Sequence, residues 1–172
     1  LTYSNPTLTY VTINANAAED EGGGMYLFAS NPILTHVTIS DNIASDVGGG
    51  MRLYAESFPI LINSIIVDNS PESFYFDLLS YPWITYSNIL GGWEGEGNID
   101  SNPLFTDPEN DNYTLQEGSP CIDAGTYFFV FEGDTLINMT PDEYFDSAPD
   151  MGAFEYEGIE CSDLGDVNGD QL

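Results

Sequence analysis

Carboxylates are the side chains with the most chemical potential in this sequence of 172 residues, which sets 29 Asp and Glu against one basic residue, Arg52. Two pairs recur at matching places in a repeated pattern: Asp20 with Asp46, and Asp41 with Asp68. Two carboxylates held about 5 Å apart could act on a glycosidic bond, or they could share a Ca²⁺ ion. We interpret both pairs first as solvated turns, with calcium sites as the next alternative and a catalytic pair as the third.

A third acidic group lies further along the chain, where Asp107, Glu109 and Asp111 alternate with other residues. Alternate carboxylates in a loop can offer several oxygen ligands to one hard cation. A simple exposed turn explains the same pattern. We therefore hypothesise Ca²⁺ as the cofactor of this chain, with these three residues and the two stacked pairs as candidate ligands.

Acid–base and nucleophilic chemistry has few candidate residues here. His36 is the only histidine, and no serine can be named as its partner in a catalytic triad. A lyase acting on uronates would need a strong base, for which Arg52 is the sole candidate. We expect His36 to be exposed and idle, and Arg52 to be an exposed strand residue paired with carboxylates. The sequence thus predicts no catalytic residue.

The charge and composition exclude several classes of function. A formal net charge of −28 leaves no basic patch for nucleic acid or an anionic membrane, and it should attract cations. With 42% hydrophobic residues, including 11 Tyr and 10 Phe, the chain is too apolar for a disordered acidic tail. No apolar run approaches the ~18 residues of a membrane span, and no signal peptide is visible.

An internal repeat determines the expected architecture, because self-similarity at a fixed period is typical of solenoids. The stretch 5–13 returns as 31–39, and the glycine block 22–25 returns as 48–51, both at an offset of 26. Third and fourth copies follow at offsets of 27 and 23. Since the chain opens inside this pattern, we expect it to be cut from a longer precursor.

Apolar residues alternate within each copy, which is the two-residue period of a β-strand, and no stretch keeps the 3.6-residue period of a helix. Short strands in such copies fit a parallel β-helix, in which each strand pairs with its equivalent one coil later, about 4.8 Å away. We predict an all-β solenoid of about four coils. Like residues should then stack in ladders: Leu8, Leu34, Leu61 and Ile84; Ile13, Ile39, Ile66 and Ile89; and Ser64 with Ser87.

Three asparagines also share a register position. Asn16, Asn42 and Asn69 each follow a ladder isoleucine by three residues. Stacked amides can pass hydrogen bonds along the axis and satisfy the buried backbone of a turn. Alternatively, asparagine simply tolerates the left-handed geometry of a turn. We favour the ladder as the prediction.

The coils span residues 1–101, and the pattern then loosens into acidic loops with aromatic runs. The last coil of a solenoid exposes apolar ladders and unpaired strand edges unless something covers its end. We assign that task to residues 102–158, as an irregular C-terminal cap. Residues 159–172 form a linker and a separate tail.

Two stretches, 84–93 and 97–105, resemble secreted bacterial right-handed parallel β-helix repeat proteins. Three later motifs look like the C-terminal region called the choice-of-anchor Q domain: Asp111-Asn112-Tyr113-Thr114-Leu115, Ser119-Pro120-Cys121-Ile122-Asp123-Ala124-Gly125 and Asp150-Met151-Gly152-Ala153-Phe154-Glu155. The resemblance implies a right-handed coil and an extracellular or cell-surface location, without implying an activity. The fold also occurs in pectate lyases and polygalacturonases, which leaves an enzyme open by analogy only.

The last residues resemble the start of the first calcium loop of a dockerin module. Asp166, Asn168 and Asp170 would be its positions 1, 3 and 5, with the Leu172 carbonyl at position 7. Two features depart from the pattern: Gln171 replaces the expected glycine, and the sequence ends before the acidic residue at position 12. We therefore expect this truncated loop to bind calcium weakly or not at all.

The two cysteines, Cys121 and Cys161, flank the cap. In a secreted protein an even number of cysteines favours a disulfide, so we predict that these two are joined. A zinc site would need further Cys or His ligands, which the sequence lacks.

Three functions remain as hypotheses. The first is an extracellular structural or binding β-helix protein, acidic and calcium-associated, at the cell surface or in a matrix. The second is a fragment of a carbohydrate-active, pectate-lyase-like enzyme with its catalytic coils upstream. The third is a subunit of a head-to-tail filament formed by stacking coils. Expected partners are carbohydrate, other surface proteins or a second copy, with no nucleic acid and no membrane insertion.

Overall fold

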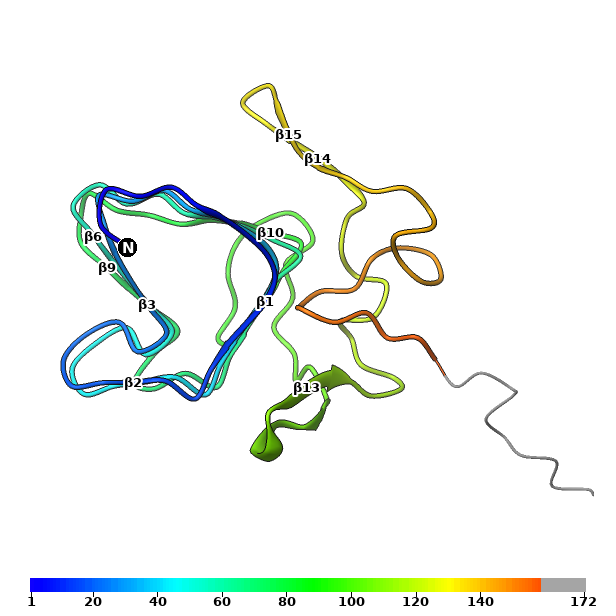
Figure 1. The fold of residues 1–172 in the computed structure, drawn as a ribbon, viewed down its shortest axis with the longest axis horizontal. Helices are drawn as coiled ribbons and strands as arrows, with labels where there is room; N and C mark the ends of the chain where they lie inside the picture. The colour runs from blue at the N-terminus through cyan, green and yellow to red at the C-terminus, as the bar shows by residue number, and fades with distance from the viewer. Residues whose placement is uncertain (159–172) are drawn as a thin grey trace, which may run out of the picture.

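The computed structural model describes residues 1–158, and the chain there forms a parallel β-solenoid of about three turns. Figure 1 looks along the solenoid axis, so that successive coils lie over one another. From the N-terminal coil, nearest the viewer, the chain runs clockwise as it recedes, which makes the coil right-handed. The predicted all-β solenoid is confirmed, with its fourth copy reduced to short strands.

Parallel strands of successive coils form the largest sheet. They are β1 (Thr7–Asn14), β4 (Ile33–Ser40), β7 (Ile60–Ile62), β8 (Ile65–Val67), β10 (Trp83–Thr85) and β11 (Asn88–Ile89). The register pairs each residue with its equivalent one coil later, and it confirms both apolar ladders, Leu8–Leu34–Leu61–Ile84 and Ile13–Ile39–Ile66–Ile89. All eight side chains pack in the interior of the coil, where the leucine and isoleucine of the second and third copies are fully buried.

This sheet bends at one stacked position, which alternation alone does not predict. Tyr10, His36, Asn63 and Tyr86 all have left-handed backbones, with φ angles of 55°, 52°, 51° and 47°. A left-handed residue breaks the two-residue period of a strand. As a result Leu34 and Val37 both reach the interior although they are three residues apart.

Two smaller sheets complete the cross-section. One contains β3 (Met25–Phe28), β6 (Met51–Tyr54) and β9 (Phe74–Phe76), and the other pairs β2 (Ala17–Ala18) with β5 (Ile43–Ala44). The glycine blocks lie just before β3 and β6, where backbones of neighbouring coils approach very closely. A Cβ on Gly24 would lie 2.7 Å from the Gly50 carbonyl oxygen. The repeated glycines are therefore required by coil stacking.

A short segment after the fourth copy covers the end of the coil. Trp93 packs against the interior cluster, with its ring 5.5 Å from that of Phe74 and 5.3 Å from that of Tyr81. The backbone then returns beneath the last strands, where Ile89 N donates to the Ile99 carbonyl at 3.0 Å. The cover that we had expected from residues 102–158 is thus supplied, at this end, by Trp93 and its neighbours.

Residues 102–158 lie beside the largest sheet rather than over its end (Figure 1). Their regular elements are β12 (Phe105–Asp107), the 3₁₀ helix η1 (Pro108–Asn110), β13 (Asn112–Leu115), β14 (Phe128–Phe131) and β15 (Asp134–Asn138). We call this region the lateral cover. Among residues 1–158 no helix is long and apolar enough to cross a bilayer.

The lateral cover buries the outward side chains of the sheet in a second apolar cluster. Ile65 and Val67 of β8 pack there with Phe105, Tyr113 and Met151. Backbone groups add direct links, because Ala153 N donates to Thr38 Oγ1 at 3.1 Å and Gly152 N to the Asn63 carbonyl at 2.8 Å. The sheet is therefore apolar on both sides for part of its length.

Candidate functional site

The three register asparagines form a continuous hydrogen-bonded column. Asn16 Nδ2 donates to Asn42 Oδ1 at 2.9 Å, and Asn42 Nδ2 donates to Asn69 Oδ1 at 3.0 Å. The same Asn42 Nδ2 also donates to the carbonyls of Ile13 and Ser40. Asn42 is fully buried, so these bonds satisfy turn backbone that water does not reach.

A second polar column went unnoticed in the sequence. Ser4, Ser30 and Ser57 each donate a backbone N–H to the hydroxyl of the serine one coil later, at 3.1 Å, and the last acceptor is Ser80. The predicted Ser64–Ser87 stack follows the same rule, with Ser64 N donating to Ser87 Oγ at 3.0 Å. The signal was present as four serines in register. Both columns hold the coil together rather than form an active site.

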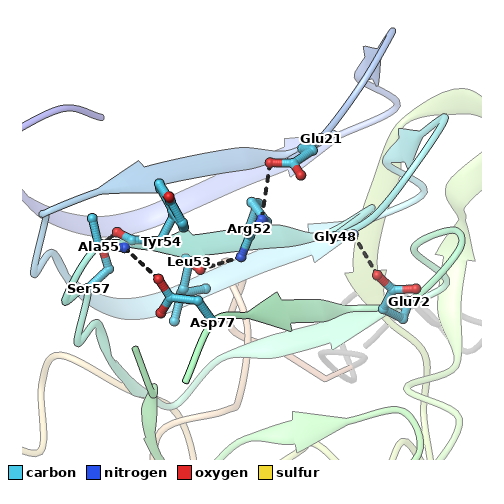
Figure 2. Close-up of polar contacts among 9 residues, drawn as sticks. All are labelled: Glu21, Gly48, Arg52, Leu53, Tyr54, Ala55, Ser57, Glu72 and Asp77. Atoms are coloured by element: carbon cyan, nitrogen blue, oxygen red, sulfur yellow. Dashed lines mark hydrogen bonds and ion pairs between the residues drawn. The ribbon is translucent and has the colours of Figure 1, made fainter. Parts of the chain in front are cut away.

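Arg52, the one basic side chain, lies between tyrosines on the outside of β6. Its Nε donates to Glu21 Oε2 at 3.1 Å, and its Nη1 donates to the Leu53 carbonyl at 2.6 Å (Figure 2). The guanidinium lies 5.2 Å and 5.0 Å from the ring centres of Tyr54 and Tyr75. We expected an exposed strand residue, but Arg52 is buried, because flanking rings and the ion pair enclose it.

Two carboxylates of the shortened third copy cap backbone groups of the second copy. Asp77 Oδ2 accepts from Ala55 N at 3.0 Å, and Glu72 Oε1 accepts from Gly48 N at 2.6 Å (Figure 2). The bond from Ala55 is the main reason why the pKa of Asp77 is lowered. These carboxylates replace backbone partners where the third copy is shorter than the second, so their function is structural.

His36 also differs from its prediction. Only 2% of it is exposed, whereas we expected an exposed residue, because the lateral cover closes over this part of β4. Its ring stacks on Tyr10 at 4.7 Å between centres, and its Nε2 lies 2.9 Å from Asn63 Nδ2. Burial lowers its pKa to about 4. His36 is therefore a neutral packing residue at neutral pH.

The stacked carboxylate pairs lie in turns, as expected. Asp41 Oδ2 accepts from Tyr113 Oη at 2.9 Å and from Ser40 Oγ at 2.9 Å, so one member of that pair is already bonded. Burial, and then the charge of Asp41, raise the pKa of Asp68. Asp20 and Asp46 are linked through backbone, with Asp46 N donating to the Asp20 carbonyl at 2.9 Å, beside a shallow open hollow.

Two carboxylates of the acidic loop are already bonded, one within the loop and one to β1. Asp107 Oδ2 accepts from Asn110 Nδ2 at 2.8 Å, and Asp111 Oδ1 accepts from Asn14 Nδ2 at 2.6 Å, while Glu109 lies in η1. Within residues 1–158 no three His, Cys, Asp or Glu side chains are placed to hold one metal ion. The candidate ligands Asp166, Asn168 and Asp170 lie outside the described residues.

Cys121 is fully buried in the second apolar cluster. Its Sγ accepts from Asn88 Nδ2 at 3.2 Å, and burial raises the pKa of the thiol to about 11. Cys161 lies outside the described residues, so the disulfide stays a prediction.

One carboxylate group in the lateral cover was not singled out from the sequence. Asp150 accepts from Asp123 N at 2.8 Å and from Tyr156 N at 2.6 Å, while Glu155 Oε1 accepts from Asp150 N at 3.0 Å. Burial and the charge of Asp150 raise the pKa of Glu155 to about 7. Glu155 Oε2 has no partner in the described part of the chain. These bonds tie the end of the cover together.

A scan of protein-family models, a search of curated proteins and a search of solved structures all found no match to this chain. The fold assignment therefore depends on the structure of this chain alone. The resemblances to the choice-of-anchor Q domain and to dockerin stay predictions.

Proposed function

We propose that this chain is an extracellular structural and binding β-solenoid, displayed at a cell surface or in a matrix, and that it is not an enzyme. The observation that supports this most strongly is the state of Arg52 and His36, the two nitrogen bases considered for lyase and triad chemistry. Arg52 is held by Glu21 and a backbone carbonyl, and His36 is buried under the lateral cover. Neither side chain is available to remove a proton from a substrate.

The surface supports a display function through its charge. With a formal charge of −28, copies of the chain repel one another, which favours solubility and discourages contact with anionic surfaces. The hydrogen-bonded columns link each coil to the next. A cross-linked acidic solenoid is suited to presenting a binding surface in a fixed geometry outside a cell.

An enzyme assay tests the absence of catalysis. Homogalacturonan, xylan and galactomannan are incubated with the chain, with and without Ca²⁺, and unsaturated uronate and new reducing ends are measured. We expect no product above the buffer control. Product formation that His36→Gln or Arg52→Lys abolishes, in variants that melt like the parent, would contradict the proposal in favour of the lyase alternative.

A location assay tests display outside the cell. Intact cells of the source organism are treated with a protease that does not enter them, and the released peptides are identified. We expect peptides from exposed loops of this chain, such as the one that contains Leu78 and Leu79. Their release only after lysis would place the chain inside the cell and contradict the proposal.

We further propose that calcium associates with the stacked carboxylates of the coil. Support comes from the Asp41 and Asp68 pair, one coil apart, where burial and then the charge of Asp41 raise the pKa of Asp68. A cation beside them would relieve that repulsion. Calcium should raise the melting temperature of the full chain, and about equally that of a version ending at Glu157, while Asp68→Asn should reduce the effect. A response lost on removing the tail would instead place the metal at Asp166, Asn168 and Asp170.

The filament alternative has less support. Head-to-tail stacking needs both ends of the coil free to pair, and the Trp93 segment covers the C-terminal end.

A further inference from the structure

A groove runs between the outer corner of the later coils and the hairpin formed by β14 and β15. Its volume is about 470 Å³, and its lining is mainly aromatic: Phe58, Tyr81, Trp83 and Phe131, with Asn31 and Glu132 as polar groups. The hairpin projects from the lateral cover past the corner where β10 begins (Figure 1). The groove thus combines repeat and non-repeat parts of the chain.

The aromatic rings are fixed in place but not covered. Trp83 pairs in register with Ile60, and its ring lies 5.1 Å from that of Phe131 in an edge arrangement. Tyr81 N donates to the Ser57 carbonyl at 3.1 Å, which fixes its backbone. Yet Trp83 is 53% exposed, Tyr81 56% and Phe58 47%. Rigid aromatic surface left open to water is typical of ligand sites.

Coil stacking does not explain Trp83, although Tyr81 also packs against Trp93 at the end of the coil. The interior ladders keep leucine and isoleucine from the first copy to the last. The outer position of Trp83 instead changes along the coils, since Thr7, Ile33 and Ile60 occupy it in earlier copies. The fold therefore tolerates small or aliphatic residues there, and the tryptophan adds nothing that the coil requires.

The polar groups of the groove limit what it can bind. Asn31 Oδ1 accepts from Phe58 N at 2.8 Å, and Asn31 Nδ2 donates no bond to any of residues 1–158. Glu132 lies at the tip of the hairpin, in a two-residue turn with Gly133 in which both φ angles are positive. The groove thus offers an amide donor and carboxylate acceptors beside the aromatic faces. Its described lining has no cation, which disfavours an anionic ligand.

We propose that this groove binds a neutral carbohydrate chain, with sugar rings stacked on Trp83 and Tyr81 and hydroxyls bonded to Asn31 and Glu132. A sugar ring has apolar C–H faces and a rim of hydroxyls that both donate and accept, which matches flat aromatic rings edged by an amide and a carboxylate. The inference rests on the proposed binding function and names its ligand class.

Other occupants fit less well. A purely apolar partner would cover Asn31 and Glu132 without giving them hydrogen bonds, and each unpaired group lowers affinity. A second copy of the chain would bring its own charge of −28 to an acidic surface.

Affinity electrophoresis tests the proposal on the full chain. Native gels contain hydroxyethylcellulose, xylan, galactomannan or laminarin as neutral polymers, and homogalacturonan with a chelator as the anionic one. We expect at least one neutral polymer to retard the chain and homogalacturonan not to. Failure of every neutral polymer, or retardation by homogalacturonan alone, would overturn the proposal. Because the gel measures binding without turnover, this failure leaves the absence of catalysis standing.

Variants show whether the groove is the site. Trp83→Ala should weaken the interaction about tenfold, and Trp83→Phe should retain most of it because a flat ring remains. Tyr3→Ala is the matched control, since Tyr3 is 76% exposed and contacts Phe28 away from the groove. Melting temperatures establish that each variant folds. Equal retardation of Trp83→Ala and parent would overturn the proposal, as would self-association in sedimentation that Trp83→Ala abolishes.

Discussion

The coils and the lateral cover stabilise themselves in opposite ways. In the coils, one type of contact repeats at each register position, as in the columns of Asn16–Asn42–Asn69 and Ser30–Ser57–Ser80. The cover instead depends on contacts that occur once, such as Ala153 N to Thr38 Oγ1 and Tyr113 Oη to Asp41 Oδ2. A defect in the coils should therefore affect neighbouring coils, whereas a defect in the cover should remain local.

The largest expected effect comes from the glycines between coils. Gly49→Ala places a Cβ against the backbone of Ser70, which cannot move without opening the third coil. We expect a loss of about 3 kcal/mol or more in the free energy of unfolding, measured by denaturant titration. Gly133→Ala is the control, because its Cβ meets no atom within 4 Å, and its positive φ alone should cost about 1 kcal/mol. Equal losses would show that coil spacing does not require Gly49.

Acid should weaken the junction between the two regions through His36. Its pKa is lowered to about 4 in the folded state, so its contribution is complete above the unfolded value near 6.5 and is lost as pH falls through 4. The loss should reach up to about 3 kcal/mol. His36→Asn keeps a residue that tolerates the left-handed backbone and removes the titration. The two proteins should differ in the slope of stability against pH between 6.5 and 4; parallel slopes would refute this.

The asparagine column offers the next test. Asn42→Ala should cost about 2 kcal/mol, because buried carbonyls of Ile13 and Ser40 lose their donor. Asn16→Ala should cost less, since Asn16 is exposed at the end of the column. Because the two share a hydrogen bond, the double variant should be non-additive. Thermal unfolding of the four proteins gives the coupling, and strict additivity would argue against a cooperative column.

A defect in the lateral cover should reduce the free energy of unfolding less than a defect in the coils. Gly152 has a positive φ of 97°, and the Cβ added by Gly152→Ala would lie 2.7 Å from Ile65 Cδ1. We expect a loss of about 1–2 kcal/mol, confined to the cover. Hydrogen exchange should become faster at Ala153 and Met151 while Ile39 stays protected. Faster exchange at Ile39 would show that coils and cover unfold as one unit.

The smallest effect is an opposite pH response within the cover. The pKa of Glu155 is raised to about 7, so its contribution is complete below the unfolded value near 4.5 and is lost as pH rises through 7. Glu155→Gln should remove this decline and modestly raise the melting temperature at pH 8. Glu157→Gln, an exposed neighbour, is the control. A variant that still loses stability between pH 5 and 8 would assign the effect to another group.

The sequence could predict the contacts within the coils but not those made by the lateral cover. The ladders of Leu34 and Ile39 were predictable, because a fixed offset brings identical residues into contact whatever the rest of the chain does. The burial of His36 was not, because it depends also on the lateral cover, whose Ala153 and Thr126 bond to the neighbouring Thr38 and Asn63. Arg52 was misjudged for a related reason. Its enclosure depends on Tyr54, Tyr75 and Glu21, which come from three coils and share no motif.

The groove also could not be predicted from the sequence. Trp83 belongs to the repeat, but Phe131 comes from a hairpin whose position no periodicity fixes. Alternation beside the ladder residue Ile84 is consistent with an outward Trp83, but it does not indicate what lies opposite. The serine column differs, since its four residues stand in register in the sequence and the repeat alone is enough to predict it.

The number of residues between bonded groups predicts the order in which the coils and the lateral cover fold. Partners in the asparagine column are 26 or 27 residues apart, whereas Ala153 and Thr38 are 115 apart. Short loops close faster than long ones, so the coils should assemble while the chain is still being synthesised, before the lateral cover exists. Until then the outer side of β4 stands open to water and to other nascent chains. Pulse-labelling during refolding should accordingly show Ile39 protected before Ala153, and the reverse order would rule this sequence of events out.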